Sequence, residues 1–295
     1  MKAKVQVIIS MLIFGSISIV VRRIDLPSGT IALSRAMLGS IFIYLYCLIT
    51  RKKISYSIIK ENLIFLSISG AFMGFNWILL FQAYKYTTVS NATLAYYFAP
   101  TIVMLISPFL LKEKLNIRKL LCVVISVIGL FMIVNNGGDI GPSYNHPLGI
   151  TYGLIAAVLY ASIIILNKFL KNISGLESTL VQLAISAFVL AFYVFLVEKP
   201  NASMFKVEFV PYILILGIVY TGITYTLYFT GMQELKGQTI ATLSYIDPIS
   251  AIIISALFLN EKITLVQIIG GLLILGSGFV IDKVKMPEKK EAILE

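Results

Sequence analysis

A long apolar segment occurs twice in this sequence and limits the possible folds more than any other feature. The copies are residues 92–114 and 241–262, and each contains an internal proline and ends in Glu-Lys. At an offset of 148 residues, the matched pairs include Tyr97 and Tyr245, Pro100 and Pro248, and Glu113 and Glu261. A repeat at this separation predicts two related structural halves.

The composition places these halves in a membrane. Of the 295 residues, 58% are hydrophobic and only 13% are charged, whereas about a quarter of the residues of a soluble domain are charged. A soluble core could not cover this much apolar surface, so the lipid bilayer is the expected solvent. The net charge of +10 is scattered over short loops, a pattern that does not favour nucleic acid as a partner.

Ten apolar segments are long enough to span a bilayer. Helices are expected because they satisfy their own backbone hydrogen bonds in lipid, and barrel strands would alternate in polarity at about half this length. The sequence therefore predicts an all-α integral membrane protein with ten transmembrane helices. The predicted segments are 5–21, 29–49, 62–84, 88–111, 117–134, 148–169, 177–197, 209–232, 238–259 and 264–282.

A polar stretch rich in Gly, Pro and Asn, residues 135–147, divides the ten segments into two sets of five. The predicted units are a first five-helix repeat at 1–134, this outer linker, a second five-helix repeat at 148–282 and a cytoplasmic tail at 283–295. Because five is odd, two homologous halves must cross the membrane in opposite directions. Such an inverted repeat is typical of transporters that work by alternating access, with the substrate site between the halves.

The basic residues predict the orientation. With the N-terminus inside, 17 of the 24 Lys and Arg residues lie in cytoplasmic segments and six on the outer side. This bias predicts a multi-pass protein of the cell inner (plasma) membrane with both termini in the cytoplasm. Arg22 and Arg23 are on the outer side and run against the bias.

Several short elements, spread over nearly the whole chain, resemble one transporter family. They are Phe14-Gly15-Ser16, Arg35, Ala83-Tyr84, the duplicated Ala-Thr-Leu…Pro…Glu-Lys, Tyr225 with Gly231-Met232, and Asp247-Pro248. With these elements the chain resembles the EamA-type transporters of the drug/metabolite transporter superfamily. The family's usual tryptophan before Gly15 is Phe14 here, and its usual glutamate before Pro248 is Asp247. The resemblance implies an exporter of a small amphipathic metabolite, such as an amino acid or a nucleoside.

Two ionisable residues lie within predicted spans, where charge is costly and normally faces the bundle interior. Arg35 is a candidate for binding a substrate carboxylate or for gating, or a structural arginine that caps carbonyls or pairs with a loop acid such as Asp25. Asp247 precedes Pro248, which should kink the helix and free a backbone carbonyl. Its carboxyl group either takes up a proton or a cation, or only satisfies that kink.

Aromatic and amide side chains gather in the third, fourth, eighth and ninth spans. Where these side chains share a helical face, two such faces would enclose an amphipathic pocket. The alternative is an interfacial belt of aromatic residues, above all for rings near span ends such as Tyr84. The predicted substrate-binding residues are Asn76, Trp77, Phe81, Tyr84, Tyr97, Thr224, Tyr225, Tyr228 and Tyr245.

The remaining motifs bear on competing functions. The sequence has no phosphate-binding G-x-x-x-x-G-K-[ST] motif and no His/Cys cluster, so we expect no cofactor and no metal. Energy would come from protons, sodium or the substrate gradient. A secondary transporter is therefore favoured over the alternatives of a lipid-modifying membrane enzyme or a passive channel. Glu113 and Glu261, at the ends of the repeated segments, are expected to pair with a basic group or a helix end.

Overall fold

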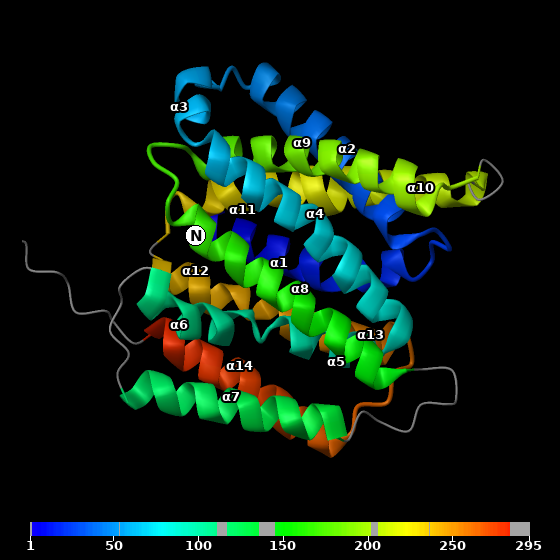
Figure 1. Ribbon diagram of the computed structural model, residues 1–295, viewed down its shortest axis with the longest axis vertical. Coiled ribbons are helices and arrows are strands. Elements are labelled where there is room, and N and C mark those ends of the chain that lie inside the picture. Colours follow the sequence, from blue (N-terminus) through cyan, green and yellow to red (C-terminus); the bar gives the residue numbers. More distant parts are fainter. Residues whose placement is uncertain are drawn as a thin grey trace, which may run out of the picture.

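Helices make up all the regular secondary structure in the part of the chain that the structure describes (Figure 1). Seven helical segments there are long and apolar enough to cross a membrane, and three further apolar helices are shorter. The predicted all-helical membrane protein is thus confirmed, whereas the ten-span inverted repeat stays a prediction. The computed structural model describes residues 2–52, 54–110, 117–135, 145–201, 206–235 and 237–283.

Corresponding helices occur in the same order along the two halves. The first half contains α1 (Lys2–Val21), α2 (Ser28–Ile49), α3 (Tyr56–Glu61), α4 (Leu63–Tyr86), α5 (Val89–Tyr96), α6 (Ala99–Leu110) and α7 (Ile117–Asn135). The second half contains α8 (His146–Asn167), α9 (Gly175–Tyr193), η1 (Val194–Glu198), η3 (Val207–Phe209), α10 (Val210–Leu214), η4 (Ile215–Ile223), α11 (Thr224–Met232), α12 (Gly237–Ser244), α13 (Ile246–Phe258) and α14 (Leu265–Lys283). The helices α5 and α12 begin 148 residues apart, as do α7 and α14.

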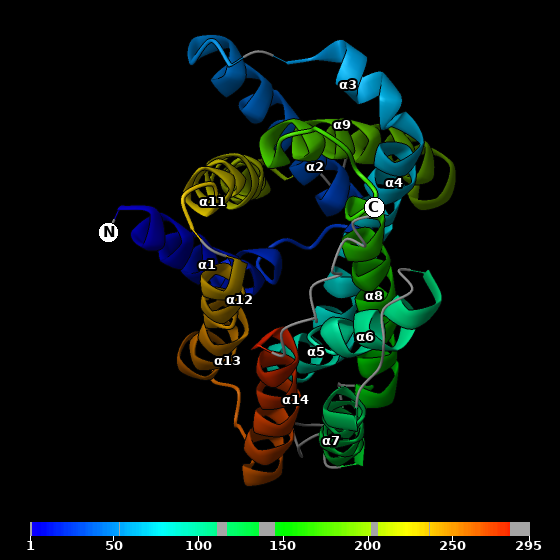
Figure 2. The ribbon, with the colours of Figure 1, turned by 90° about the vertical axis from the view of Figure 1, so that its left-hand side faces the viewer.

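Helices from the first half pack between helices from the second. In the interior, α4 contacts α8 and α9, and α1 contacts α11 and α13. Under the repeat, α1 with α11 corresponds to α8 with α4, so the same kind of pair forms twice. These interleaved helices surround the centre of the molecule (Figure 2).

The last helix of each half forms a separate pair at one end of the molecule, where α7 and α14 lie side by side (Figures 1 and 2). A Cβ atom on Gly129 would lie 2.6 Å from the carbonyl oxygen of Gly270, and one on Gly270 would lie 2.8 Å from the carbonyl oxygen of Gly129. These small residues allow the two backbones to touch. Ser126 and Ser277 add a buried hydrogen bond between the two helices.

The duplicated apolar segments are each broken into two helices, whereas the sequence predicted a kink at Pro248. The first segment is interrupted between α5 and α6, and the second between α12 and α13 at Tyr245. Pro100 and Pro248 lie in the first turn of α6 and α13. A proline fits there because first-turn N–H groups have no partner within their helix.

Candidate functional site

A cavity of about 640 Å³ lies between the two halves. Its walls are formed by α1, α2, α4, α5 and α6 of the first half and by α8, α9, α11, α12 and α13 of the second. In the described part of the chain, α7 and α14 contribute no lining residue. This volume is in the range of small-molecule binding sites.

Most of the residues predicted from the sequence meet in this cavity. They are Arg35, Trp77, Phe81, Tyr84, Tyr97, Tyr225, Tyr228, Tyr245 and Asp247. Asn76 and Thr224 lie outside the lining. The Asn76 amide donates to the backbone oxygen of Ala156 at 2.6 Å, and the Thr224 hydroxyl donates to that of Val219 at 2.7 Å. The Asn76 amide thus joins α4 to α8, whereas the Thr224 hydroxyl bonds within its own helical segment.

Arg35 lies on α2 with its guanidinium group over the ring of Trp77, 4.0 Å from the ring centroid. Its Nε donates to the hydroxyl of Thr221 at 2.9 Å, in the π-helical segment η4, a form of helix often found at functional sites. The suggested pairing with Asp25 was wrong, because Thr221 and Trp77 hold the side chain instead. Among the described residues the η nitrogens of Arg35 have no hydrogen-bond acceptor, and they remain available to a ligand in the cavity.

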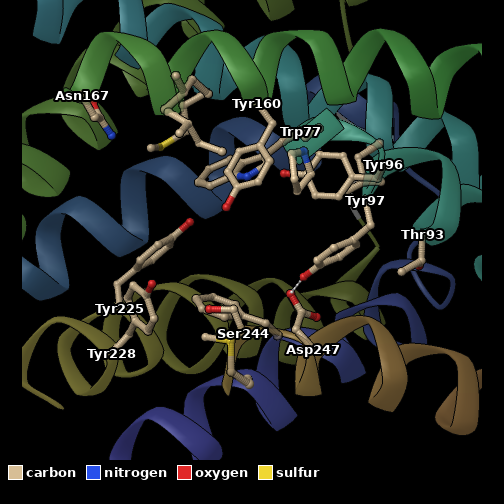
Figure 3. Close-up of a pocket in the computed structure, with 18 of the residues that line it drawn as sticks. Trp77, Thr93, Tyr96, Tyr97, Tyr160, Asn167, Tyr225, Tyr228, Ser244 and Asp247 are labelled. Atoms are coloured by element: carbon tan, nitrogen blue, oxygen red, sulfur yellow. Dashed lines mark hydrogen bonds between the residues drawn. The ribbon is translucent and has the colours of Figure 1, made fainter. Parts of the chain in front are cut away.

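Asp247 lies in the first turn of α13, next to Tyr97 at one end of the cavity (Figure 3). Its Oδ2 accepts a hydrogen bond from the hydroxyl group of Tyr97, the residue that caps the C-terminus of α5. This bond joins the two halves at one end of the cavity. Asp247 and Arg35 are near enough to attract one another electrostatically. The described lining therefore contains one carboxylate, Asp247, and two basic side chains, Arg35 and Lys168, among aromatic rings. This arrangement suits an amphipathic ligand with charged groups.

The aromatic rings occupy opposite walls of the cavity. Figure 3 shows Trp77, Tyr96 and Tyr160 on one wall and Tyr225 and Tyr228 on the other. The ring of Tyr96 stacks on that of Tyr160 with centroids 5.2 Å apart. The predicted aromatic pocket is thus present geometrically, and Tyr84, a candidate for the interfacial belt, is buried in its wall.

Sequence reasoning did not select several residues that line this cavity. They include Thr93, Tyr96, Tyr160, Asn167, Gln182 and Ser244. Tyr160 had a usable signal, because an offset of 146 residues pairs it with Phe14, which also lines the cavity. Asn167 and Gln182 had none: they meet through a 2.6 Å hydrogen bond between α8 and α9, which only packing brings about.

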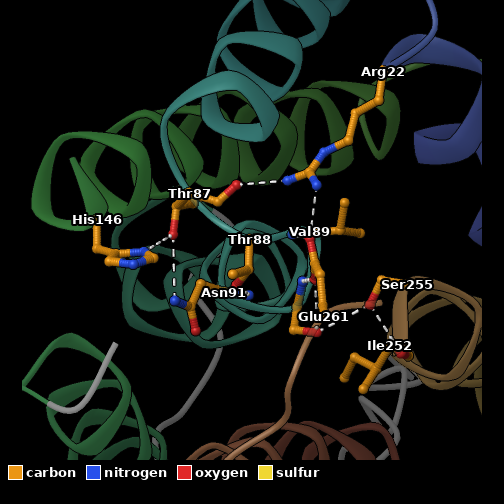
Figure 4. Close-up of polar contacts among 10 residues, drawn as sticks. Arg22, Thr87, Thr88, Val89, Asn91, His146, Ile252, Ser255 and Glu261 are labelled. Atoms are coloured by element: carbon orange, nitrogen blue, oxygen red, sulfur yellow. Dashed lines mark hydrogen bonds and ion pairs between the residues drawn. The ribbon is translucent and has the colours of Figure 1, made fainter. Parts of the chain in front are cut away.

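Near the start of α8, a buried polar network crosses between the halves (Figure 4). The carboxylate of Glu261 forms an ion pair with Arg22 at 2.9 Å and accepts the backbone N–H of Val89 at 2.8 Å. Arg22 also donates to the backbone oxygen of Thr87 at 2.9 Å. The expected pairing of Glu261 with a basic group and a helix end is confirmed. The ion pair gives Arg22 a structural role that does not depend on the orientation of the chain. Glu113 lies outside the described residues.

The EamA-like transporter family matches this chain twice, over residues 1–135 and 147–281. The chain belongs to the EamA-like transporter family. The resemblance inferred from the short motifs is thereby confirmed.

The relatives agree with this assignment. The chain is 26% identical over 295 residues to "Uncharacterized transporter YxxF" of Bacillus subtilis, with 99% of this chain and 93% of that protein covered. An "Uncharacterized transporter" of Archaeoglobus fulgidus is 24% identical and covers 91% of this chain. A crystal structure with 16% identity superposes with a TM-score of 0.65 over 95% of this chain, which supports the fold alone. Family and relatives indicate a multi-pass membrane transporter rather than an enzyme.

Proposed function

We propose that this EamA-family protein is a secondary transporter that exports a small amphipathic metabolite, such as an amino acid, a nucleoside or a related compound, by alternating access. In this proposal ten helices form two inverted repeats of five, both termini lie in the cytoplasm, and the protein resides in the cell inner membrane. Protons or sodium would drive net flux. Substrate would bind to Arg35, Asp247 and the aromatic residues between the halves.

The observation that carries this proposal is the cavity between the halves, where the free η nitrogens of Arg35 and the carboxyl group of Asp247 face the same space. An isolated charged side chain within the bilayer is costly in free energy, so such a residue normally pairs with another group or binds a substrate or an ion. Arg35 can bind an anionic group and Asp247 a cationic one, while the rings cover the apolar part of a substrate. Each half contributes to both charged sites, so relative movement of the halves would alter them.

The proposal is tested by flux measurements on purified protein in liposomes, with candidate metabolites chosen by a growth-inhibition screen with and without overexpression. A transporter gives saturable flux that responds to an imposed gradient and shows counterflow. Flux that rises linearly with concentration would indicate a passive channel. Turnover of lipid without flux of any candidate would indicate an enzyme.

The inverted repeat leads to a separate prediction about topology. Single cysteines placed within 135–147 and after Lys283 are expected to react with a membrane-impermeant thiol reagent from opposite sides of the membrane. The reason is that the proposed arrangement puts five spans between the two segments, and the distribution of Lys and Arg predicts that the tail is inside. Labelling of both segments from the same side would remove the inverted repeat and with it the argument for alternating access.

A further inference from the structure

The short helix α5 is attached to α13 along its length. At the C-terminal end of α5, Tyr97 donates to Asp247 near the start of α13. At the N-terminal end, the hydroxyl of Ser90 lies 3.1 Å from that of Ser255, and the backbone N–H of Ser90 donates to Glu261, just beyond the end of α13. The two helices are therefore antiparallel, and polar contacts join them at both ends across the boundary between the halves.

Glu261 makes the strongest of these contacts. It is only 8% exposed, and its carboxylate faces the first backbone N–H groups of α5 while it is paired with Arg22. A carboxylate is favoured at a helix N-terminus, where it meets unpaired N–H groups and the positive end of the helix dipole. Bonds to a charged partner are about twice as strong as neutral ones. The contact holds α5, α13 and the end of α1 together.

The pair of helices that the repeat relates to α5 and α13 is arranged differently. The repeat relates α5 to α12 and α13 to α6. Ser244 near the end of α12 and Val103 and Ser107 of α6 all line the cavity, and Figure 2 shows α12 and α6 apart. The cavity therefore extends between α6 and α12 toward Asn167, whereas the contact of α5 with α13 bounds its other end (Figure 3).

We propose that the α5–α13 contact is the outer gate of this transporter and that the hydrogen bond of Tyr97 to Asp247 is its inner latch. This inference rests on the proposed function, and it assigns gating roles to Tyr97, Ser90, Ser255 and Glu261. Opening toward the outer side separates α5 from α13 and breaks their contacts. Because Asp247 also faces the substrate cavity, a ligand that binds its carboxylate competes with the Tyr97 hydroxyl and loosens the gate from inside.

The gate is tested without any substrate by a cysteine reporter. Thr93 on α5 lines the cavity at its closed end and is 4% exposed. A Thr93→Cys variant is made in a background where the buried free cysteines Cys47 and Cys122 are alanine. An impermeant thiol reagent added from the outer side should label this cysteine slowly, and faster from the inner side through the open end of the cavity.

Two substitutions should open the gate. Glu261→Gln removes the ion pair and the charge at the helix end, and Tyr97→Phe removes only the latch hydroxyl. Each is expected to raise the rate of outer labelling of the reporter at least about tenfold, because a hydrogen bond to a charged group contributes enough free energy for a change of that size. The matched control is Glu208→Gln, which removes an exposed ion pair with Lys206 and should leave the rate unchanged.

The converse experiment locks the gate. A disulfide between Ser90→Cys and Ser255→Cys should abolish net flux while binding from the inner side is retained, and reduction should restore flux. The gate proposal would be wrong if Glu261→Gln and Tyr97→Phe both fold and both leave the rate of outer labelling unchanged. Full flux by the cross-linked protein would also contradict it. If no substrate is ever transported, the proposed function fails, but the labelling result still decides whether α5 and α13 close the cavity.

Discussion

Trp77→Ala is expected to lower the initial rate of substrate transport at least about thirtyfold. The Trp77 ring lies under the Arg35 guanidinium at 4.0 Å, and both side chains are buried. A desolvated cation–π contact contributes about 2 kcal/mol or more, which corresponds to a factor of about thirty. Removal of the ring leaves the cation poorly placed for an anionic group of the substrate. The measurement is initial-rate flux in proteoliposomes, normalised to the amount of folded protein.

Two further variants keep this prediction decisive. Trp77 is only 5% exposed, so its truncation also creates a cavity and costs about 3–5 kcal/mol of stability. Tyr225→Ala, on the facing wall and only partly buried, should abolish transport with less effect on folding. The matched control is Phe188→Ala, because this ring is 65% exposed on α9 and lies outside the cavity. Normal transport by Tyr225→Ala and by folded Trp77→Ala would show that these rings serve packing alone.

Asp247→Asn is expected to separate substrate exchange from gradient-driven flux. The asparagine has nearly the shape of the aspartate, and its side-chain oxygen can still accept the Tyr97 hydroxyl, but it can take up neither a proton nor a cation. With the neutral group in place, the halves can close without a buried charge. Counterflow of substrate should therefore persist, whereas an imposed proton gradient should no longer raise net flux. Both are measured on the same proteoliposomes.

Tyr97→Phe distinguishes the charge of Asp247 from its hydrogen bond. This variant loses the bond and keeps the carboxyl group, so its net flux should still respond to the proton gradient. If Asp247→Asn retains full gradient-driven transport, Asp247 has a structural role at the start of α13. Coupling would then have to be sought at Arg35, or the flux would be facilitated diffusion.

The sequence by itself determined the class of the fold and the family. Apolar stretches of about twenty residues must be helical in lipid, because the bilayer offers no hydrogen-bond partner to the backbone. The duplicated segment indicated two halves whatever their packing. Arg35 and Asp247 could also be selected from the sequence alone, because a charge within a span must face the bundle interior or a cavity. Both line the cavity.

Only the tertiary structure decided which uncharged polar side chains face that cavity. Membrane helices are apolar on all sides, so periodicity does not mark the buried face as it does in soluble proteins. Asn76 was therefore assigned to the pocket although it bonds to the backbone of α8, and Tyr160 was not selected although it lines the cavity. The ion-pair partner of Arg22 and the hydrogen-bond acceptor of Tyr97 lie more than 140 residues away in the chain. Contacts of this kind depend on how the two halves pack against each other, which no local pattern in the sequence records.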